Sequence, residues 1–189
     1  MTQPEAAREP PRASILLDAI EAALAPSHAV GLPDNASAAL FSLLERHPRV
    51  RLISVTREGE AFAVAAGLWA GGRAPLVVVQ NTGLLESGDA LRGTAVRMGV
   101  PLVFVVTYRG HARAAAHGPL PPPLPLTGEA LVDPRVDSVA LLTEPTLAAW
   151  GIPYVRYGSD ADVDQIEAAA RRARDEARPV ALLLTRALA

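Results

Sequence analysis

Short apolar runs alternate with segments of helical periodicity along the whole chain. The apolar runs predict six strands, over residues 29–32, 50–55, 74–80, 101–107, 152–156 and 179–185. The runs over 74–80 and 101–107 are apolar at both odd and even positions, which is typical of strands covered on both faces. This alternation predicts an α/β fold, with a doubly wound, mostly parallel six-stranded sheet and helices on both faces.

The segments between these runs have the spacing and the end signals of helices. Helices are expected over residues 14–25 with Ser14 as N-cap, over 58–70, over 85–98, ahead of Trp150 with interruptions at Pro134 and Pro145, and up to about residue 177 after a cap at Asp160 or Asp162. A further helix is expected after the possible caps Asp34, Asn35 and Ser37, because Leu40, Leu43 and Leu44 have helical spacing. Residues 108–127 are rich in Pro, Gly and His and are expected to form a long loop. Residues 1–12 are expected to be a flexible arm before a single domain over 13–189.

The composition excludes several classes of protein. Half of the 189 residues are hydrophobic and 20% are charged, which supplies enough apolar side chains for a packed core. Cys and Lys are both absent, so the chain offers no thiolate site and no Schiff-base lysine. A net charge of −2 with 4% aromatic residues argues against nucleic-acid binding. Without a membrane-length apolar run or the apolar segment of a secretory signal, we expect no membrane span and a cytoplasmic location.

Polar and glycine residues gather directly after four of the predicted strands. They occupy residues 33–35, 56–60, 81–83 and 108–111. Binding sites of parallel sheets lie outside the carboxyl ends of the strands, so these four segments are expected to meet at one site.

Glu58 is the most specific candidate in these segments. On a helix that starts at this residue, Ala61, Phe62, Ala65 and Trp69 share its face. A carboxylate would then head an apolar stripe, as a catalytic acid often does. The spacing by itself favours a structural reading, in which Glu58 and Glu60 are first-turn acids that complement the helix dipole.

Common nucleotide, metal and hydrolase motifs are absent from the sequence. It contains no GxGxxG after a strand, no GxxxxGK[ST], no metal-ligand spacing among its four His, and no GxSxG. The motifs therefore predict no metal site on this chain.

Five segments resemble the pyrimidine-binding (PYR) domain of thiamine-diphosphate enzymes. They are LPDN at 32–35, TREGEAFAVAAG at 56–67, VVVQNTGL at 77–84, VPLVFVVTYRG at 100–110 and GIPY at 151–154. Within this family they are most similar to the alpha subunit of sulfopyruvate decarboxylase and the matching half of phosphonopyruvate decarboxylase. The resemblance extends over about four-fifths of the chain (roughly 150 residues, a domain-sized stretch).

The resemblance implies roles for particular residues. The family's matching glutamate hydrogen-bonds a ring nitrogen of the aminopyrimidine and so activates the cofactor, which makes Glu58 the expected catalytic and cofactor-binding residue. The turn formed by Gln80, Asn81, Thr82 and Gly83 is expected to approach the thiamine diphosphate. Substrate binding is expected from Pro33, Asp34, Asn35, Arg109 and His117, since an anionic substrate tail calls for guanidinium or imidazolium donors. For Arg109, His111 and His117, a solvated loop without a binding role remains the alternative.

Two features depart from the pattern of the family. Leu85 and Glu86 stand where close relatives usually have Gly and Asn, and Glu86 brings a negative charge near the expected entry of an anionic substrate. The segment over residues 128–150 is also longer than in the family.

The family's diphosphate-binding (PP) domain has no counterpart in this sequence. Its GDG…N motif holds the diphosphate and a divalent cation, and here only Ser87-Gly88-Asp89-Ala90 stands in its place. The resemblance therefore implies a separate PP-domain beta subunit that carries the Mg²⁺, in a hetero-oligomer or homo-oligomer. The implied function is decarboxylation of a small 2-oxo acid. The alternatives are a thiamine-diphosphate carboligase subunit and a non-catalytic PYR-like module that binds a partner.

Overall fold

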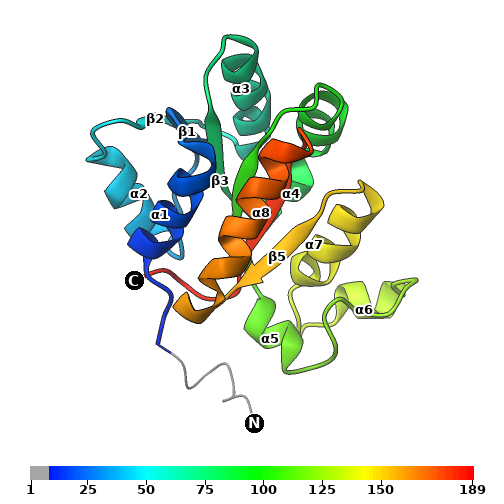
Figure 1. Ribbon diagram of the computed structural model, residues 1–189. Coiled ribbons are helices and arrows are strands. Elements are labelled where there is room, and N and C mark those ends of the chain that lie inside the picture. Colours follow the sequence, from blue (N-terminus) through cyan, green and yellow to red (C-terminus); the bar gives the residue numbers. More distant parts are fainter. Residues whose placement is uncertain (1–8) are drawn as a thin grey trace.

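The computed structural model describes residues 9–189 and contains one six-stranded, fully parallel sheet (Figure 1). The strands are β1 His28–Gly31, β2 Arg51–Ser54, β3 Pro75–Gln80, β4 Val103–Thr107, β5 Tyr154–Tyr157 and β6 Val180–Leu184. Their order in the sheet is β2-β1-β3-β4-β6-β5. The predicted α/β class and the six-stranded parallel sheet are thus confirmed.

Helices cover both faces of this sheet (Figure 1). One face carries α1 Ala13–Leu24, α2 Ala38–Glu45 and α8 Val163–Asp175, which follows the 3-10 helix η3 Asp160–Asp162. The other face carries α3 Glu58–Ala70, α4 Asn81–Glu86, the π-helix η2 Asp89–Val96, α5 His111–Ala115 and α7 Ser138–Ala149, with α6 Gly128–Val132 packed on α7. Within residues 9–189, no helix has the length and apolar character needed to cross a membrane.

The central strands are apolar on both parities because alternate residues serve two separate cores. Val78 of β3 packs with α1, α2 and α8, whereas its neighbour Val77 packs with α3, η2 and α7. In the second core Phe62 of α3 meets Phe104 of β4 edge to face, with ring centroids 5.2 Å apart. An edge-to-face pair of this kind fixes α3 over the middle of the sheet.

Tertiary contacts move three helix boundaries away from the predicted positions. The N-cap of α1 is Arg12, not Ser14, because the Arg12 backbone N–H donates to the Asp160 carboxylate at 2.8 Å. Helix α4 begins at Asn81, directly after β3, so residues 80–83 form the strand end and first helical turn, not a separate turn. The predicted helix over 85–98 is thereby divided into α4 and η2.

The segment after β4 is more ordered than predicted. It contains α5, so residues 108–127 are only partly a loop. Pro145 lies inside α7, and the helix continues through it to Ala149. Pro134 falls between α6 and α7, as expected of a residue that interrupts a helix.

The predicted arm over residues 1–12 lies mostly outside the described residues. Its last residues contact the C-terminal segment: the Ala189 N–H donates to the Pro11 carbonyl at 2.9 Å, and Arg186 donates to the Glu9 carbonyl at 3.1 Å. The C-terminus also accepts a hydrogen bond from Ala13, which joins the start of α1 to the end of the chain.

Candidate functional site

The candidate site lies at the carboxyl edge of the sheet, where the strand order changes direction. From β1 the chain moves to β2 on one side, and β3 then lies on the other side of β1. Connections that diverge in this way open a crevice outside the ends of the strands. Gln80, Thr107 and Leu184 lie level with one another at the ends of β3, β4 and β6.

Asp34, which follows β1, bonds to the ends of β3 and β4. Its Oδ1 accepts from the Ser37 backbone N–H and hydroxyl, each at 2.8 Å, and its Oδ2 accepts from the Gln80 amide at 3.3 Å and from the Thr107 hydroxyl. Burial by itself would raise the pKa of Asp34, but these hydrogen bonds outweigh it and lower the pKa below its usual value. Asp34 is therefore an ionised carboxylate at the base of the crevice.

A cavity of about 410 Å³ opens beside Asp34. Its lining consists of Asp34, Asn35, Ala36, Gln80, Thr107, Tyr108, Arg109, Leu184, Thr185, Arg186 and Ala187. Four of these residues, Asp34, Asn35, Gln80 and Arg109, were predicted as binding residues from the sequence. The guanidinium of Arg109 pairs with Asp137 at 3.0 Å, and Arg186 supplies a second guanidinium to the lining.

The sequence prediction missed the contributions of Thr107, Thr185 and Arg186. Thr107 is the last residue of β4, and Thr185 and Arg186 directly follow β6. The rule that selected the other strand ends would have found Thr185 and Arg186, had it been applied to the last strand as well.

Glu58 is the first residue of α3, as predicted, and its side chain lies against Gly83 of α4. A Cβ at Gly83 would lie only 2.3 Å from Glu58 Cβ and 2.5 Å from Glu58 Cδ, so no larger residue fits there without a shift. Glu58 is half-buried, and within residues 9–189 its carboxylate has neither a hydrogen bond nor an ion pair. It does not line the 410 Å³ cavity.

The predicted apolar stripe behind Glu58 is present. Ala61, Phe62 and Ala65 are fully buried, and Trp69 is half-buried. Glu60, two residues from Glu58, is exposed and accepts a 3.4 Å hydrogen bond from the Thr56 hydroxyl. The two first-turn carboxylates thus have different surroundings, and Glu58 alone of the pair heads the apolar face.

Glu86 pairs with Arg57 next to this region. The Arg57 Nε donates to Glu86 Oε1 at 2.8 Å, and a hydrogen bond to Glu86 raises the pKa of the Arg57 guanidinium. The negative charge that distinguishes this chain from the family pattern is therefore compensated by a neighbouring positive charge.

The residues at the end of β3 and the start of α4 lead from Gly83, against which Glu58 lies, to the cavity. Thr82 donates to the Gln80 side-chain oxygen at 3.0 Å, and Gln80 in turn contacts Asp34. Asn81 is fully buried, and its amide nitrogen donates to the Arg109 carbonyl and to the Thr143 hydroxyl, both at 3.0 Å. Because the Thr143 hydroxyl donates to Val139, the Asn81 nitrogen must be the donor toward Thr143.

The amide of Asn81 is left with one unsatisfied atom. Among the described residues, no donor reaches its buried Oδ1. The two bonds of its nitrogen fasten the start of α4 to α7 and to the backbone of Arg109, and Asn81 does not line the 410 Å³ cavity.

Two of the predicted substrate residues lie apart from the cavity. Pro33 is exposed beside Asp34 but does not line it. His117 is exposed, bonds the Arg113 carbonyl through Nδ1 at 2.8 Å, and lines a second cavity instead. His111, for which a role was left open, is buried with its ring 4.9 Å from that of Tyr108.

Glu58 is the side chain of this region that suits the pyrimidine end of thiamine diphosphate. It offers a half-buried carboxylate that has no hydrogen bond or ion pair among residues 9–189, which suits a ring nitrogen that shares a proton. In the part of the chain that the structure describes, no group of three or more His, Cys, Asp or Glu side chains is placed to hold a metal ion.

Comparisons with known proteins give partial matches to two kinds of decarboxylase. No family model matches the chain. A phosphonopyruvate decarboxylase of Streptomyces viridochromogenes is 36% identical over 80 residues, which are 42% of this chain and 20% of the relative. A sulfopyruvate decarboxylase subunit alpha of Methanothermobacter thermautotrophicus is 30% identical over 82 residues, which are 43% of this chain and 50% of the relative.

A second sulfopyruvate decarboxylase subunit alpha, from Methanocaldococcus jannaschii, is 27% identical over 82 residues and is matched over 48% of its length. The chain thus spans about half the length of these alpha subunits and a fifth of the phosphonopyruvate decarboxylase. The matched 42–43% of this chain is less than the four-fifths predicted from its motifs. The matches nevertheless fall on the two decarboxylases that the motifs indicated, and they are consistent with a domain of the PYR type.

Proposed function

We propose that this protein is the PYR-type alpha subunit of a two-chain, thiamine-diphosphate-dependent 2-oxo acid decarboxylase. The observation that carries the proposal is the Glu58 carboxylate, which heads an apolar helix face, lies against Gly83 and has no competing ion pair within residues 9–189. The relatives, which are decarboxylases and in several cases alpha subunits, support it.

In this proposal Glu58 holds a proton for the cofactor. Thiamine diphosphate, when bound, supplies an electron sink for the loss of CO₂ from a 2-oxo acid. The Glu58 carboxyl group shares a proton with a ring nitrogen of the aminopyrimidine. Ala61 and Phe62 keep water away from the helix side of this contact, which strengthens the hydrogen bond. Gly83 leaves the space that the Glu58 side chain needs.

The 410 Å³ cavity is proposed to receive the substrate. Asp34 is held ionised by its donors and fixes the Gln80 amide at the cavity wall. Arg109 is a candidate donor to a carboxylate or other anionic group of the substrate, with Asn35 at the same wall. Pro33 lies next to this wall, at the outer side of Asp34. His117 receives no role at this cavity, because it lies on another one.

The remaining half of the site is proposed to come from a PP-domain beta subunit. That partner would hold the diphosphate and Mg²⁺, and its surface would close over the half-buried Glu58. A hetero-oligomer follows from this arrangement, and a cytoplasmic location remains part of the proposal.

The test is Glu58→Gln in the complex of this chain with its PP-domain partner, with Glu60→Gln as the matched control. Loss of one positioned acid–base group is expected to lower kcat by about 10²- to 10⁴-fold. Glu60→Gln should stay near wild type, because Glu60 is exposed and contacts only Thr56 among the described residues. Full activity of Glu58→Gln would favour a non-catalytic partner-binding module, and C–C bond formation with an added acceptor aldehyde would favour a carboligase.

A further inference from the structure

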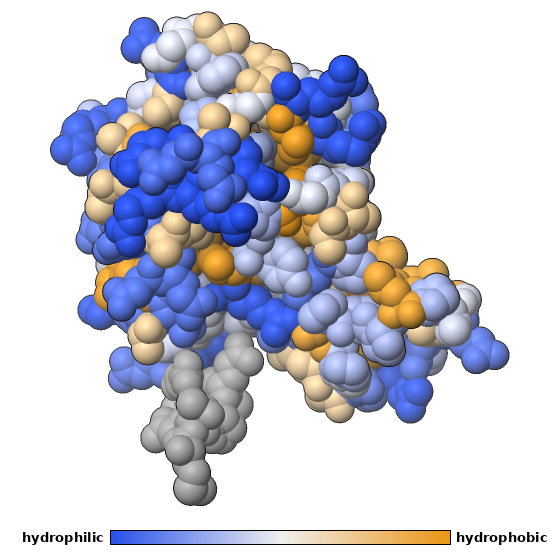
Figure 2. All heavy atoms as spheres, turned by 45° about the vertical axis from the view of Figure 1, so that its right-hand side comes forward, coloured by the Kyte–Doolittle hydropathy of each residue, from blue (hydrophilic) through white to orange (hydrophobic). Residues whose placement is uncertain are grey.

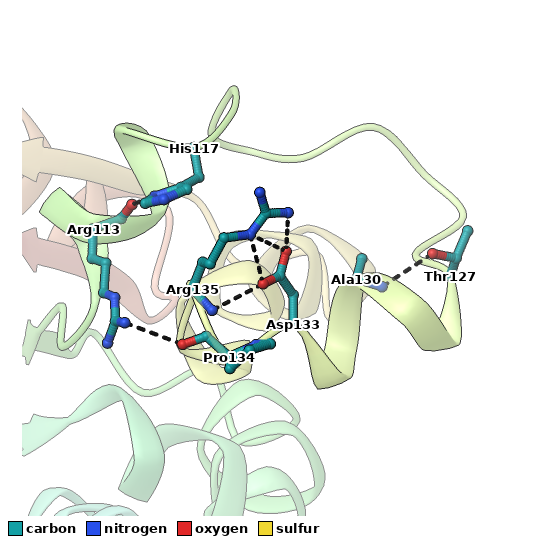
Figure 3. A network of polar contacts seen from close by, with 7 residues as sticks. All are labelled: Arg113, His117, Thr127, Ala130, Asp133, Pro134 and Arg135. Carbon is teal, nitrogen blue, oxygen red and sulfur yellow. Dashed lines mark hydrogen bonds and ion pairs between the residues drawn. The ribbon is translucent and has the colours of Figure 1, made fainter.

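A second cavity of about 290 Å³ lies beneath the proline-rich segment that follows α5. It is lined by Ala114, His117, Gly118, Pro119, Pro122, Pro123, Pro125, Leu126, Thr127, Ala130, Asp133, Arg135, Val136 and Leu141. Its lining and that of the 410 Å³ cavity, as far as the described residues define them, have no member in common. Figure 3 shows polar contacts near it, made by Arg113 of α5, by His117 and Thr127 between α5 and α6, and by residues 133–135 between α6 and α7.

Hydrogen bonds hold the walls of this cavity from several sides. The Arg156 guanidinium donates to the Leu120 carbonyl at 2.6 Å and is itself fixed by the fully buried Glu144 at 2.9 Å. On the opposite side, Arg113 donates to the Pro134 carbonyl at 3.1 Å, and Thr127 caps α6 by accepting from Ala130 at 3.2 Å (Figure 3).

The composition of the walls adds to this rigidity. Four prolines in the lining restrict the backbone dihedral angles of the covering segment. A cavity whose walls are fixed in this way loses little conformational entropy when a ligand enters.

The interior and the rim of the cavity differ in chemistry. The interior is apolar and consists of proline rings with Ala114, Leu126, Ala130, Val136 and Leu141. The lobe that contains the cavity also carries exposed apolar side chains, Leu124, Leu131 and Val132, and Figure 2 shows apolar surface on it. An apolar interior with a few polar groups at its edge is the usual composition of a small-molecule site.

The charged side chains of the lining form one ion pair. Arg135 contributes a positive charge and Asp133 a negative charge, whereas Arg113, which bonds the Pro134 carbonyl, is outside the lining. Hydrogen bonds from Arg135 lower the pKa of Asp133 to about 2, so the pair is charged at neutral pH. Arg135 binds Asp133 through Nε and Nη2, and within residues 9–189 its Nη1 has no partner. His117 Nδ1 donates to the Arg113 carbonyl at 2.8 Å, so Nε2 of the neutral ring is an acceptor and the anion donor at this cavity is Arg135.

We propose that this second cavity binds a small organic monoanion, with its apolar body among the prolines and its anionic head group at the Nη1 of Arg135. The volume lies near the lower end of the range for ligand pockets, so the ligand is compact. The site is independent of the proposed decarboxylase chemistry, because it has its own walls and its own charged groups.

The proposal is tested by titrating the full-length chain with benzoate while backbone amide signals are followed by NMR. Saturable binding with a Kd on the order of 1 mM or lower is expected, with shifts at Ala114, Ala130 and Val136. Benzyl alcohol, which has the same ring without the charge, should bind at least about fivefold more weakly (about 1 kcal/mol). Absence of saturable binding, equal affinity for both probes, or shifts centred on Asn35 and Thr185 would each overturn the proposal.

Two variants extend the test, each with a matched control elsewhere on the chain. Ala130→Leu fills the cavity and Arg135→Gln removes the anchoring guanidinium. Each should weaken benzoate binding at least about fivefold (about 1 kcal/mol), and Arg135→Gln should leave benzyl alcohol binding unchanged. The controls Ala149→Leu and Arg92→Gln, at exposed positions outside both cavities, should bind as wild type does. Unchanged benzoate binding by Ala130→Leu would refute the site, and the wild-type shift map decides the question if a variant does not fold.

Discussion

Replacing Gly83 with alanine perturbs the proposed catalytic carboxylate without changing its chemistry. The added Cβ would lie 2.3, 2.4 and 2.5 Å from Cβ, Cγ and Cδ of Glu58. Carbon atoms in contact are normally about 3.5–4.0 Å apart, so the two groups must separate by about 1 Å. Since the nearest atom is Cβ, which is fixed to the backbone, a rotation of the side chain cannot relieve the clash, and the start of α3 or α4 has to move.

The expected effects on activity and on stability differ in size. A displacement of about 1 Å in a catalytic group costs about 10²-fold in rate, which corresponds to about 2.7 kcal/mol of transition-state stabilisation. Overpacking costs about 1–3 kcal/mol of stability, and the better helix propensity of alanine offsets about 1 kcal/mol of this. Gly83→Ala should therefore remain folded and lose most of its activity.

The assay measures two quantities for Gly83→Ala and for Gly67→Ala. They are kcat of the assembled complex and the free energy of unfolding of the chain in urea. Gly67 lies on α3 and has no atom within 4 Å of its hypothetical Cβ, so alanine there should leave activity unchanged and stabilise the helix by about 0.5–1 kcal/mol. Wild-type kcat in a folded Gly83→Ala complex would refute the assignment of Glu58, because its position would then not matter to the reaction.

Three further predictions concern stability. Asp34→Asn should lower the unfolding free energy at neutral pH by about 1–3 kcal/mol. The folded-state pKa of Asp34 is lowered, so the extra stability of the wild type over Asp34→Asn should disappear as the pH falls from about 4 through that lower pKa. A difference in unfolding free energy that does not change with pH in urea titrations would contradict this. Glu144→Gln should cost about 1–3 kcal/mol, since the fully buried carboxylate accepts from Arg156, and an unchanged urea midpoint would argue against the network. Gly31→Ala should cost about 3 kcal/mol or prevent folding, because its Cβ would lie 2.0 Å from the Val78 carbonyl oxygen; a thermal midpoint equal to that of wild type would show that β1 and β3 pack differently.

Local patterns in the sequence were sufficient for the six strands and for the first residue of α3, but not for α5 or for the division between α4 and η2. Apolar runs and helical spacing depend on neighbours within a few residues, and those neighbours are the same in any fold. The prediction that polar strand ends would meet was also correct for Asp34, Gln80 and Arg109, because parallel strands bring their carboxyl ends to one edge.

Helix boundaries depended on residues far away in the sequence. Arg12 displaced Ser14 as the N-cap of α1 through a contact with Asp160, 148 residues away. The start of α4 at Asn81 is fastened by Thr143, 62 residues away. Pairings over such separations carry no periodic signal in one sequence, so propensity rules place these boundaries incorrectly.

The sequence by itself therefore determined the alternation of strands and helices, the two-faced burial of the central strands and the place of Glu58 at the head of an apolar helix face. Only the tertiary structure decided that β6 lies between β4 and β5, that Glu86 is compensated by Arg57, and that His117 faces a cavity of its own. The physical reason is range: backbone geometry and side-chain periodicity act between near neighbours, whereas strand order, ion pairs and cavities arise from contacts between segments that only folding brings together.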